Sequence, residues 1–295
     1  MNSTNDNTNF MAPSNKILAY FLTNLLFCAG SLLYAQLPDG TRSTVGWIEE
    51  IKKNRAEEEK RVFNEASAEH SVSFSVVPYV ICDVNGMANC REEDIKESID
   101  GLNFYFKTIN VLFRLQPVHY VNDYNYSSVS RNDTMDELIK MHSTERTINL
   151  YLVESAKDDT VPCYGFTWFP DDSIRNTIFL DKDFIRGNYL VTLMGHFLGL
   201  LSTHDTLGGF ENVSENNCAE SGDFLCDTWA DPNLFLMVDT LCAYAGTLID
   251  RYGQVYVPSV ANLMSESCDR CKCIFTPQQY RRMLFCVQRY RYYLR

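Results

Sequence analysis

The chain has 295 residues, of which 45% are hydrophobic and 22% are charged, which is the composition of a globular protein of one or two domains. Its 38 acidic and 26 basic residues give a formal net charge of -12. That charge disfavours a phosphate backbone or an anionic membrane as the main partner, so the sequence predicts no nucleic-acid binding.

Residues 1–35 have the features of an export signal. Lys16 precedes the apolar run 17–33, and the run ends shortly before Ala35. We expect cleavage after Ala35 and a secreted protein with no membrane anchor. The alternative is an uncleaved anchor, but polar residues interrupt the run and leave a short span.

The rest of the chain divides by charge and by periodicity. Residues 36–70 are predicted to form a charged leader or pro-region, with a solvated helix within 47–66, and residues 71–295 are predicted to form one domain. In chain order, the domain's patterns predict a strand at 72–81, an amphipathic helix at 92–108, a strand at 113–118, a short helix near 134–141, strands at 147–153 and 177–180, an apolar central helix at 189–201 and a helix that begins at Thr276. This order favours an α+β fold in which a twisted mixed sheet with helices precedes an irregular C-terminal subdomain.

The cysteines support an oxidising compartment. Of eleven in the chain, one lies in the predicted signal, and most of the remaining ten lie between Cys218 and Cys286. An even number in an exported protein favours disulfides, whose pairing the sequence leaves open. The alternative is a metal cluster that includes Cys268, Cys271 and Cys273.

One helical segment matches part of a zinc-protease motif. In H-E-x-x-H-x-x-G-x-x-H, two histidines four residues apart bind zinc, and the glutamate between them activates a water molecule. This chain matches the motif at His196 and Gly199. Without a gap, Thr192 replaces the first histidine, Leu193 stands at the general-base position and Ser202 replaces the third histidine. A loss of three residues before His196 explains the segment equally well, and it removes the same functions.

Six short segments carry a resemblance to a known family. They are YGFTWFP at 164–170, IFLD at 178–181, GHFLGL at 195–200, CDTWADP at 226–232, NLMS at 262–265, and Cys271 followed by FTPQ at 275–278. In this order they resemble the pappalysin family of metzincin zinc metalloproteases.

The resemblance implies a metzincin-like fold, a secreted endopeptidase and a bound zinc. Some relatives also bind calcium, but the sequence does not identify calcium ligands in this chain. The resemblance also implies structural roles for Gly199, for Met264 in a Met-turn, and for the cysteines Cys218, Cys226, Cys242 and Cys271. Family members carry a tyrosine two residues after the methionine, whereas this chain has Glu266.

The gaps in the motif lead to two main hypotheses. One imidazole, at His196, falls short of the three protein ligands that a zinc site needs, so we expect an inactive relative, with zinc weak or absent, that binds a peptide or protein partner. The alternative is an active zinc endopeptidase with a substitute ligand set of His196, His204 and an acidic residue. An error in the sequence of the helix is a third explanation, although Ser202 and Glu266 would each need a separate one.

Overall fold

The computed structural model describes residues 36–60, 71–131, 135–171 and 175–294. The predicted signal lies outside the described residues, as does the end of the charged leader. Residues Leu37–Arg295 form one compact unit, and the elements described here belong to it.

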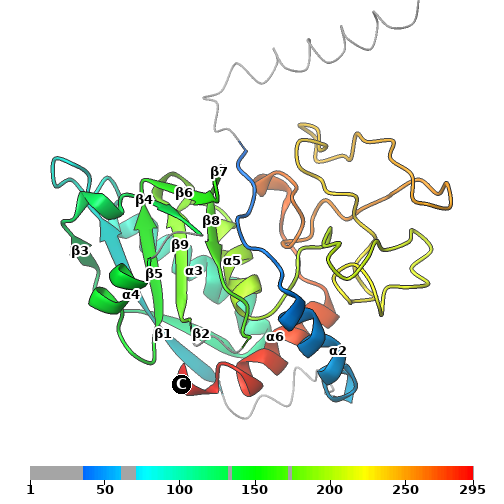
Figure 1. The fold of residues 1–295 in the computed structure, drawn as a ribbon, viewed down its shortest axis with the longest axis horizontal. Helices are drawn as coiled ribbons and strands as arrows, with labels where there is room; N and C mark the ends of the chain where they lie inside the picture. Colours follow the sequence, from blue (N-terminus) through cyan, green and yellow to red (C-terminus); the bar gives the residue numbers. More distant parts are fainter. Residues whose placement is uncertain (1–35, 61–70, 132–134, 172–174, 295) are drawn as a thin grey trace, which may run out of the picture. The chain divides into compact units, whose positions relative to one another are not determined.

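A twisted sheet forms one side of this unit, on the left in Figure 1. Its strand order is β2-β1-β5-β9-β8, and β3 also pairs with β1. All pairs are parallel except β8 with β9, which is antiparallel. The strands are β1 (Val72–Ile81), β2 (Val111–Leu115), β3 (His119–Val121), β5 (Ile148–Val153), β8 (Gly165–Thr167) and β9 (Thr177–Asp181). A small second sheet has the order β4-β6-β7, with β4 (Ser128–Ser130), β6 (Ser155–Asp158) and β7 (Val161–Cys163).

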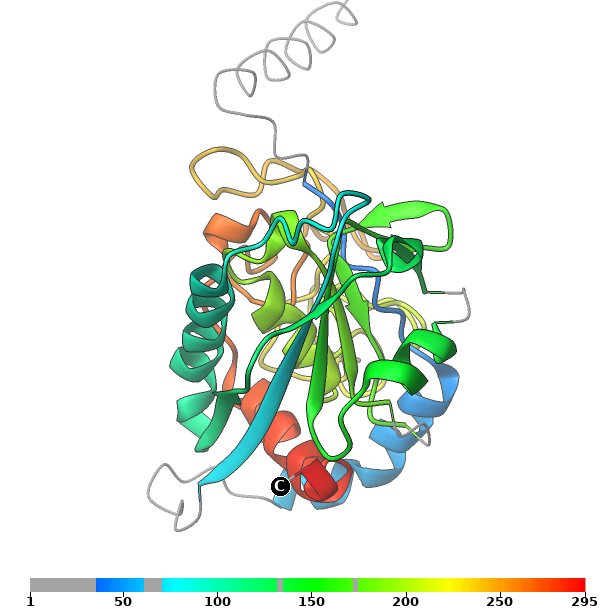
Figure 2. The same cartoon turned by 90° about the vertical axis from the view of Figure 1, so that its left-hand side faces the viewer.

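Alternation along the strands produces two apolar layers, one on each face of the sheet. Figure 2 shows helices on both sides of the sheet. In β5, Leu150 and Leu152 belong to the larger layer, whereas Tyr151 and Val153 belong to the smaller one. The larger layer includes residues of α3 (Glu92–Phe106), α5 (Tyr189–Phe197) and α6 (Pro277–Arg289), and the smaller layer includes Leu138 of α4 (Asp136–His142). The predicted α+β fold with a twisted mixed sheet is therefore confirmed.

Several predicted boundaries need correction. The central helix ends at Phe197 rather than at residue 201, because Gly199 adopts a φ of 91°. The strand expected at 113–118 is two strands, β2 and β3, which pair with successive parts of the long strand β1. The last helix begins where predicted, since Thr276 and Gln279 form the expected capping box.

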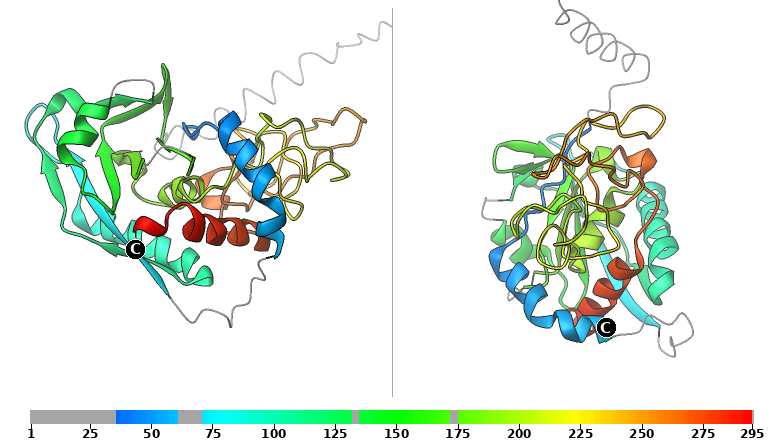
Figure 3. Two further views of the ribbon diagram at one scale, coloured as in Figure 1. Left: turned by 60° about the horizontal axis from the view of Figure 1, so that its bottom comes forward. Right: turned by 90° about the vertical axis from the view of Figure 1, so that its right-hand side faces the viewer.

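Part of the charged leader forms α2 (Val45–Lys60), which packs against α6 (Figure 3). Trp47 is buried in a third apolar cluster with Phe169 and Phe285, and the Trp47 indole stacks on the Phe169 ring. The Glu58 carboxylate, also buried, receives the Nε–H of Arg282 at 3.2 Å. The described part of this helix therefore has one face in the core and the other in solvent.

The stretch between α5 and α6 has little regular structure and is joined by disulfides. Cys218 pairs with Cys226, and Cys242 pairs with Cys271. Since Cys271 is in a disulfide, the proposed three-cysteine metal cluster is wrong. Within the described ranges, no helix has both the length and the apolar character needed to cross a membrane.

Candidate functional site

The region around His196 is built at the end of α5. Leu200 donates its backbone N–H to Gly195, and Gly199 donates to His196, which is the Schellman arrangement that ends a helix with a left-handed glycine. A side chain on Gly199 would collide with Trp47 and with Cys286. The helix therefore stops at Phe197, one residue after His196, and the chain turns back at Gly199.

A tight turn that contains Met264 lies directly against α5. The Met264 sulfur would be 2.6 Å from a Cβ added to Gly195, so the glycine permits this close approach. Thr192 donates its hydroxyl to the carbonyl of Leu263 at 2.9 Å. Thr192, at the first-histidine position, thus makes a structural hydrogen bond to the turn.

A segment of the leader runs along β8. The Gly40 N–H donates to the Gly165 carbonyl at 2.9 Å, and the Tyr164 N–H donates to the Pro38 carbonyl at 3.1 Å. Asp39 and Gly165 form an isolated parallel bridge. The segment 38–40 therefore satisfies backbone groups of the sheet edge, as an additional strand would.

Asp39 brings a carboxylate against the residual histidine of the motif. Its Oδ2 atom lies 3.3 Å from Nε2 of His196, and both side chains are almost completely buried. Nδ1 of His196 lies 2.7 Å from the Leu200 carbonyl, and the Tyr164 hydroxyl donates to Asp39 Oδ2 at 2.6 Å. Both imidazole nitrogens therefore already face protein oxygen atoms.

The partners of Asp39 keep it ionised. Burial by itself raises the pKa of this carboxyl, but attraction to His196 and hydrogen bonds from His196, Tyr164 and Thr41 leave the pKa below its ordinary value. The negative charge of Asp39 is therefore stabilised by neighbouring groups of the same chain.

The general-base position holds no acid. Leu193 is fully buried in the larger apolar layer, and its Cδ1 atom would be 2.8 Å from a Cβ added to Gly165. It fills the space between α5 and β8, where it can neither accept a proton nor polarise a water molecule.

Glu266 occupies the Met-turn position where the resembled family has tyrosine. It is buried, and its Oε1 atom accepts the backbone N–H of Asp39 at 3.3 Å. Burial and the nearby Asp39 charge together raise the pKa of Glu266 to about 7, against the lowering effect of Lys272. An acidic group here helps to hold the leader segment, and it cannot replace a phenol as a stable neutral donor.

The structure does not bring the proposed substitute ligands into a metal site. Burial lowers the pKa of His204 to about 4, and among the described residues its Nδ1 atom has no hydrogen-bond partner. In the part of the chain that the structure describes, no group of three or more His, Cys, Asp and Glu side chains could hold a metal ion. The described residues therefore do not offer zinc the three side-chain ligands that it needs.

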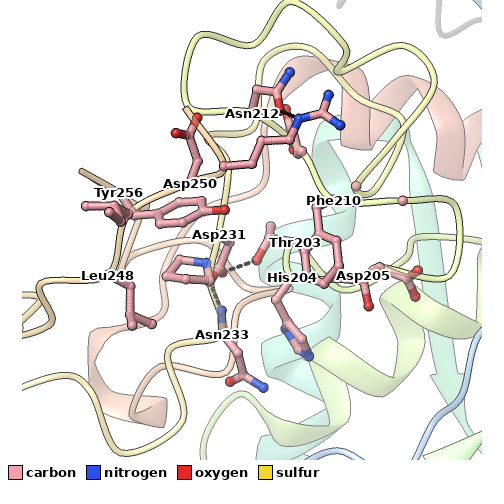
Figure 4. A pocket seen from close by; sticks show the side chains of 17 residues that line it. Thr203, His204, Asp205, Phe210, Asn212, Asp231, Asn233, Leu248, Asp250 and Tyr256 are labelled. Atoms are coloured by element: carbon pink, nitrogen blue, oxygen red, sulfur yellow. Dashed lines mark hydrogen bonds between the residues drawn. The ribbon is translucent and has the colours of Figure 1, made fainter. Parts of the chain in front are cut away.

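His204 instead lines a pocket of about 770 Å³ in the irregular region (Figure 4). Thr203 and Asp231 lie beside it, and the Thr203 hydroxyl donates to Asp231 Oδ2 at 2.6 Å. His196 and Asp39 do not line this pocket, so it is distinct from the region around His196.

The sequence did not identify two acidic residues that are central to the His196 region and to the pocket. Asp39 was assigned to the leader without a role, and Glu211, which lines the pocket, was not singled out. Tyr164 stands at the start of a family-like segment, and its position was the one available signal for a polar group near His196.

The fold is that of a metalloprotease-like protein. The chain is 24% identical to an extracellular metalloprotease of Arthroderma gypseum (strain ATCC MYA-4604 / CBS 118893) over 268 residues, which cover 86% of this chain and 84% of the relative. The solved structure of mirolysin in complex with compound 9 matches with a TM-score of 0.53 at 17% identity, and the match covers 77% of this chain and 96% of mirolysin. No protein-family model matches the chain.

Proposed function

We propose that this chain is a secreted, catalytically inactive relative of metalloproteases that acts by binding a peptide or protein partner. The observation that carries the proposal is the placement of the Asp39 carboxylate 3.3 Å from Nε2 of His196. As a zinc ligand, His196 would present this ring nitrogen to the metal. Leu193, at the general-base position, cannot assist a water molecule. Hydrolysis by a metal-activated water therefore has neither ligands nor base here.

Secretion is supported by three features. Residues 1–35 resemble a signal peptide, the region between α5 and α6 contains two disulfides, and the relative from Arthroderma gypseum is described as extracellular. The segments that resemble the pappalysin family, including the turn at Met264, support descent from a secreted zinc peptidase of that type.

A binding function is supported by what the fold retains. The sheet, the central helix and the Met264 turn are intact and well packed, while the positions for catalysis carry other residues. The edge of β8 near Gly165 is already paired with segment 38–40, so a partner would either displace this segment or use another surface.

Peptide-library digestion tests the proposal. The purified secreted chain should cleave no peptide above background, with or without added zinc. The comparison variant restores Thr192→His, Leu193→Glu and Ser202→His, together with Asp39→Ala to free His196. Cleavage by the unaltered chain that a chelator abolishes, and that His196→Ala removes, would instead establish the alternative enzyme.

A further inference from the structure

The carboxylate of Glu211 has no partner. Its side chain is only 6% exposed, and neither Oε1 nor Oε2 makes a hydrogen bond within the described residues. Glu211 lines the 770 Å³ pocket, and its Oε2 atom would be 2.5 Å from a Cβ added to Gly222. A buried carboxylate without donors is costly, so this group is in place for a ligand that supplies them.

The other acids of the pocket are already satisfied. Asp231 accepts the hydroxyl of Thr203 and the backbone N–H of Asn233, and Asp250 accepts backbone N–H groups of three residues. Asp205, the remaining acid of the lining, accepts the backbone N–H of Leu207. Among the acids that line the pocket, Glu211 is therefore the one whose carboxylate has no donor within the described residues.

The charges around Glu211 are negative. Burial raises the pKa of Glu211 to about 9, and the neighbouring acids Asp223, Glu215 and Asp231 contribute in the same direction. Arg251 also lines the pocket, but its Nε–H donates to Asn212 Oδ1 and its guanidinium lies 4.9 Å from the centre of the Tyr252 ring. Within the described residues, the charged groups that shift the pKa of Glu211 are all acids.

The mouth of the pocket is apolar and exposed. Phe210, Leu248 and Ile249 line it, with exposed fractions of 71%, 43% and 59%. Further large apolar side chains are exposed in the same irregular region, namely Leu236, Leu241, Val255 and Val257. Exposed apolar side chains around a concave polar site are typical of a protein interaction surface.

We infer that this pocket binds a lysine or arginine side chain of a partner peptide, with apolar residues of that peptide packed on Phe210, Leu248 and Ile249. The inference rests on the proposed binding function and names its site. The apolar stem of a basic side chain fits the pocket walls, and its N–H groups would satisfy the two oxygens of Glu211. A metal ion is the weaker occupant, because the described residues offer no set of three ligands.

The inference predicts that binding of a basic side chain releases a proton from Glu211. With its pKa at about 9, Glu211 is protonated in the free pocket at neutral pH, and a bound cation favours the ionised form. Binding at pH 7 should therefore release close to one proton from the Glu211 carboxyl to the buffer.

Titration calorimetry with matched peptides tests the inference. The probe is an acetylated, amidated pentapeptide with lysine between two leucines, compared with the same peptide carrying arginine or norleucine at the centre. Two amine-free buffers of different ionisation enthalpy report proton release. We expect the basic peptides to bind at least about tenfold more tightly than the norleucine peptide.

Variants locate the effect. Glu211→Gln should weaken binding of the basic peptides at least about tenfold and abolish proton release, whereas Glu220→Gln, an exposed acid outside the pocket, should change neither. Equal affinities for lysine and norleucine, unchanged binding by Glu211→Gln, or no binding at millimolar peptide would each overturn the inference. The peptide comparison uses the unaltered chain, so it does not depend on how the variant folds. The digestion result is independent of all these outcomes, so failure of the proposed function would be recognised separately.

Discussion

Asp39 and Glu211 are both buried acids, but their pKa values are shifted in opposite directions. Burial alone raises the pKa of both groups. Asp39 meets His196, Tyr164 and a backbone N–H, and its pKa falls below the ordinary value, whereas Glu211 meets only other acids and its pKa rises to about 9. Partners rather than burial decide which charge state the protein holds.

The difference separates a closed site from an open one. Around His196, each polar group that catalysis would need is either absent or engaged by the chain's own leader. In the pocket beside His204, one acid has no partner and the rim is apolar and exposed. This arrangement is what we expect of the proposed function, in which the machinery for cleavage is lost and a surface for binding is kept.

Removal of the Asp39 carboxylate should have the largest effect on stability. Asp39→Ala leaves His196 and Tyr164 buried without their acceptor, and such a change costs about 3–5 kcal/mol of unfolding free energy. Urea denaturation at pH 7 measures it. Asp100→Ala, which removes an exposed acid paired with Lys96, is the matched control and should cost less than about 1 kcal/mol.

The Asp39–His196 pair also predicts how the free energy of unfolding changes at acid pH. Because the pKa of Asp39 is lowered in the folded state, its stabilising contribution is complete above the ordinary value near 3.8 and is lost as pH falls through the folded-state value. The difference between the native chain and Asp39→Ala should therefore shrink below about pH 4. A difference equal to that of the control at pH 7 would contradict the account.

The disulfides should stabilise the irregular region to different extents. Cys242–Cys271 closes a loop of 29 residues and Cys218–Cys226 a loop of 8. Loop-closure entropy predicts losses of about 3.5 and about 2.5 kcal/mol on replacement of each pair by serine. Thermal denaturation of the two double variants would detect the order, and equal losses would show that loop length does not control it.

Neutralisation of Glu211 should give an effect on stability that grows with pH. The unfolded chain loses this proton near the ordinary pKa of 4.5 and the folded chain near 9, so the free energy of unfolding falls as pH rises between them. Glu211→Gln removes this slope, which approaches about 1.4 kcal/mol per pH unit, and should be more stable than the native chain at pH 8. Parallel stability curves for the two proteins from pH 5 to 8 would sink the assignment of an unpartnered acid.

The regular elements could be predicted from sequence because their signals are local. Alternation in β5 separates the two faces of the sheet, and the capping box at Thr276 fixes the start of α6. The helix end at Phe197 was missed by four residues, since Gly199 acts through a left-handed turn that a purely apolar pattern conceals.

The two sites were harder to predict because their partners are distant in the chain. Asp39 and His196 lie far apart in sequence, and nothing in the leader marks this acid among its many charges. Glu211 is defined by donors that are absent, which only the folded surroundings reveal. The family-like segments predicted the general location of the first site, and one of them contains Asp231, which lines the second, but none of them indicated a pocket there.

Zinc content of the purified chain tests the central claim most directly. After dialysis against zinc and then against metal-free buffer, mass spectrometry should find far less than one zinc per chain, and His196→Ala should leave the value unchanged. About one tightly held zinc per chain, lost in His196→Ala, would contradict the account, because the side chain that faces Asp39 would then be a metal ligand.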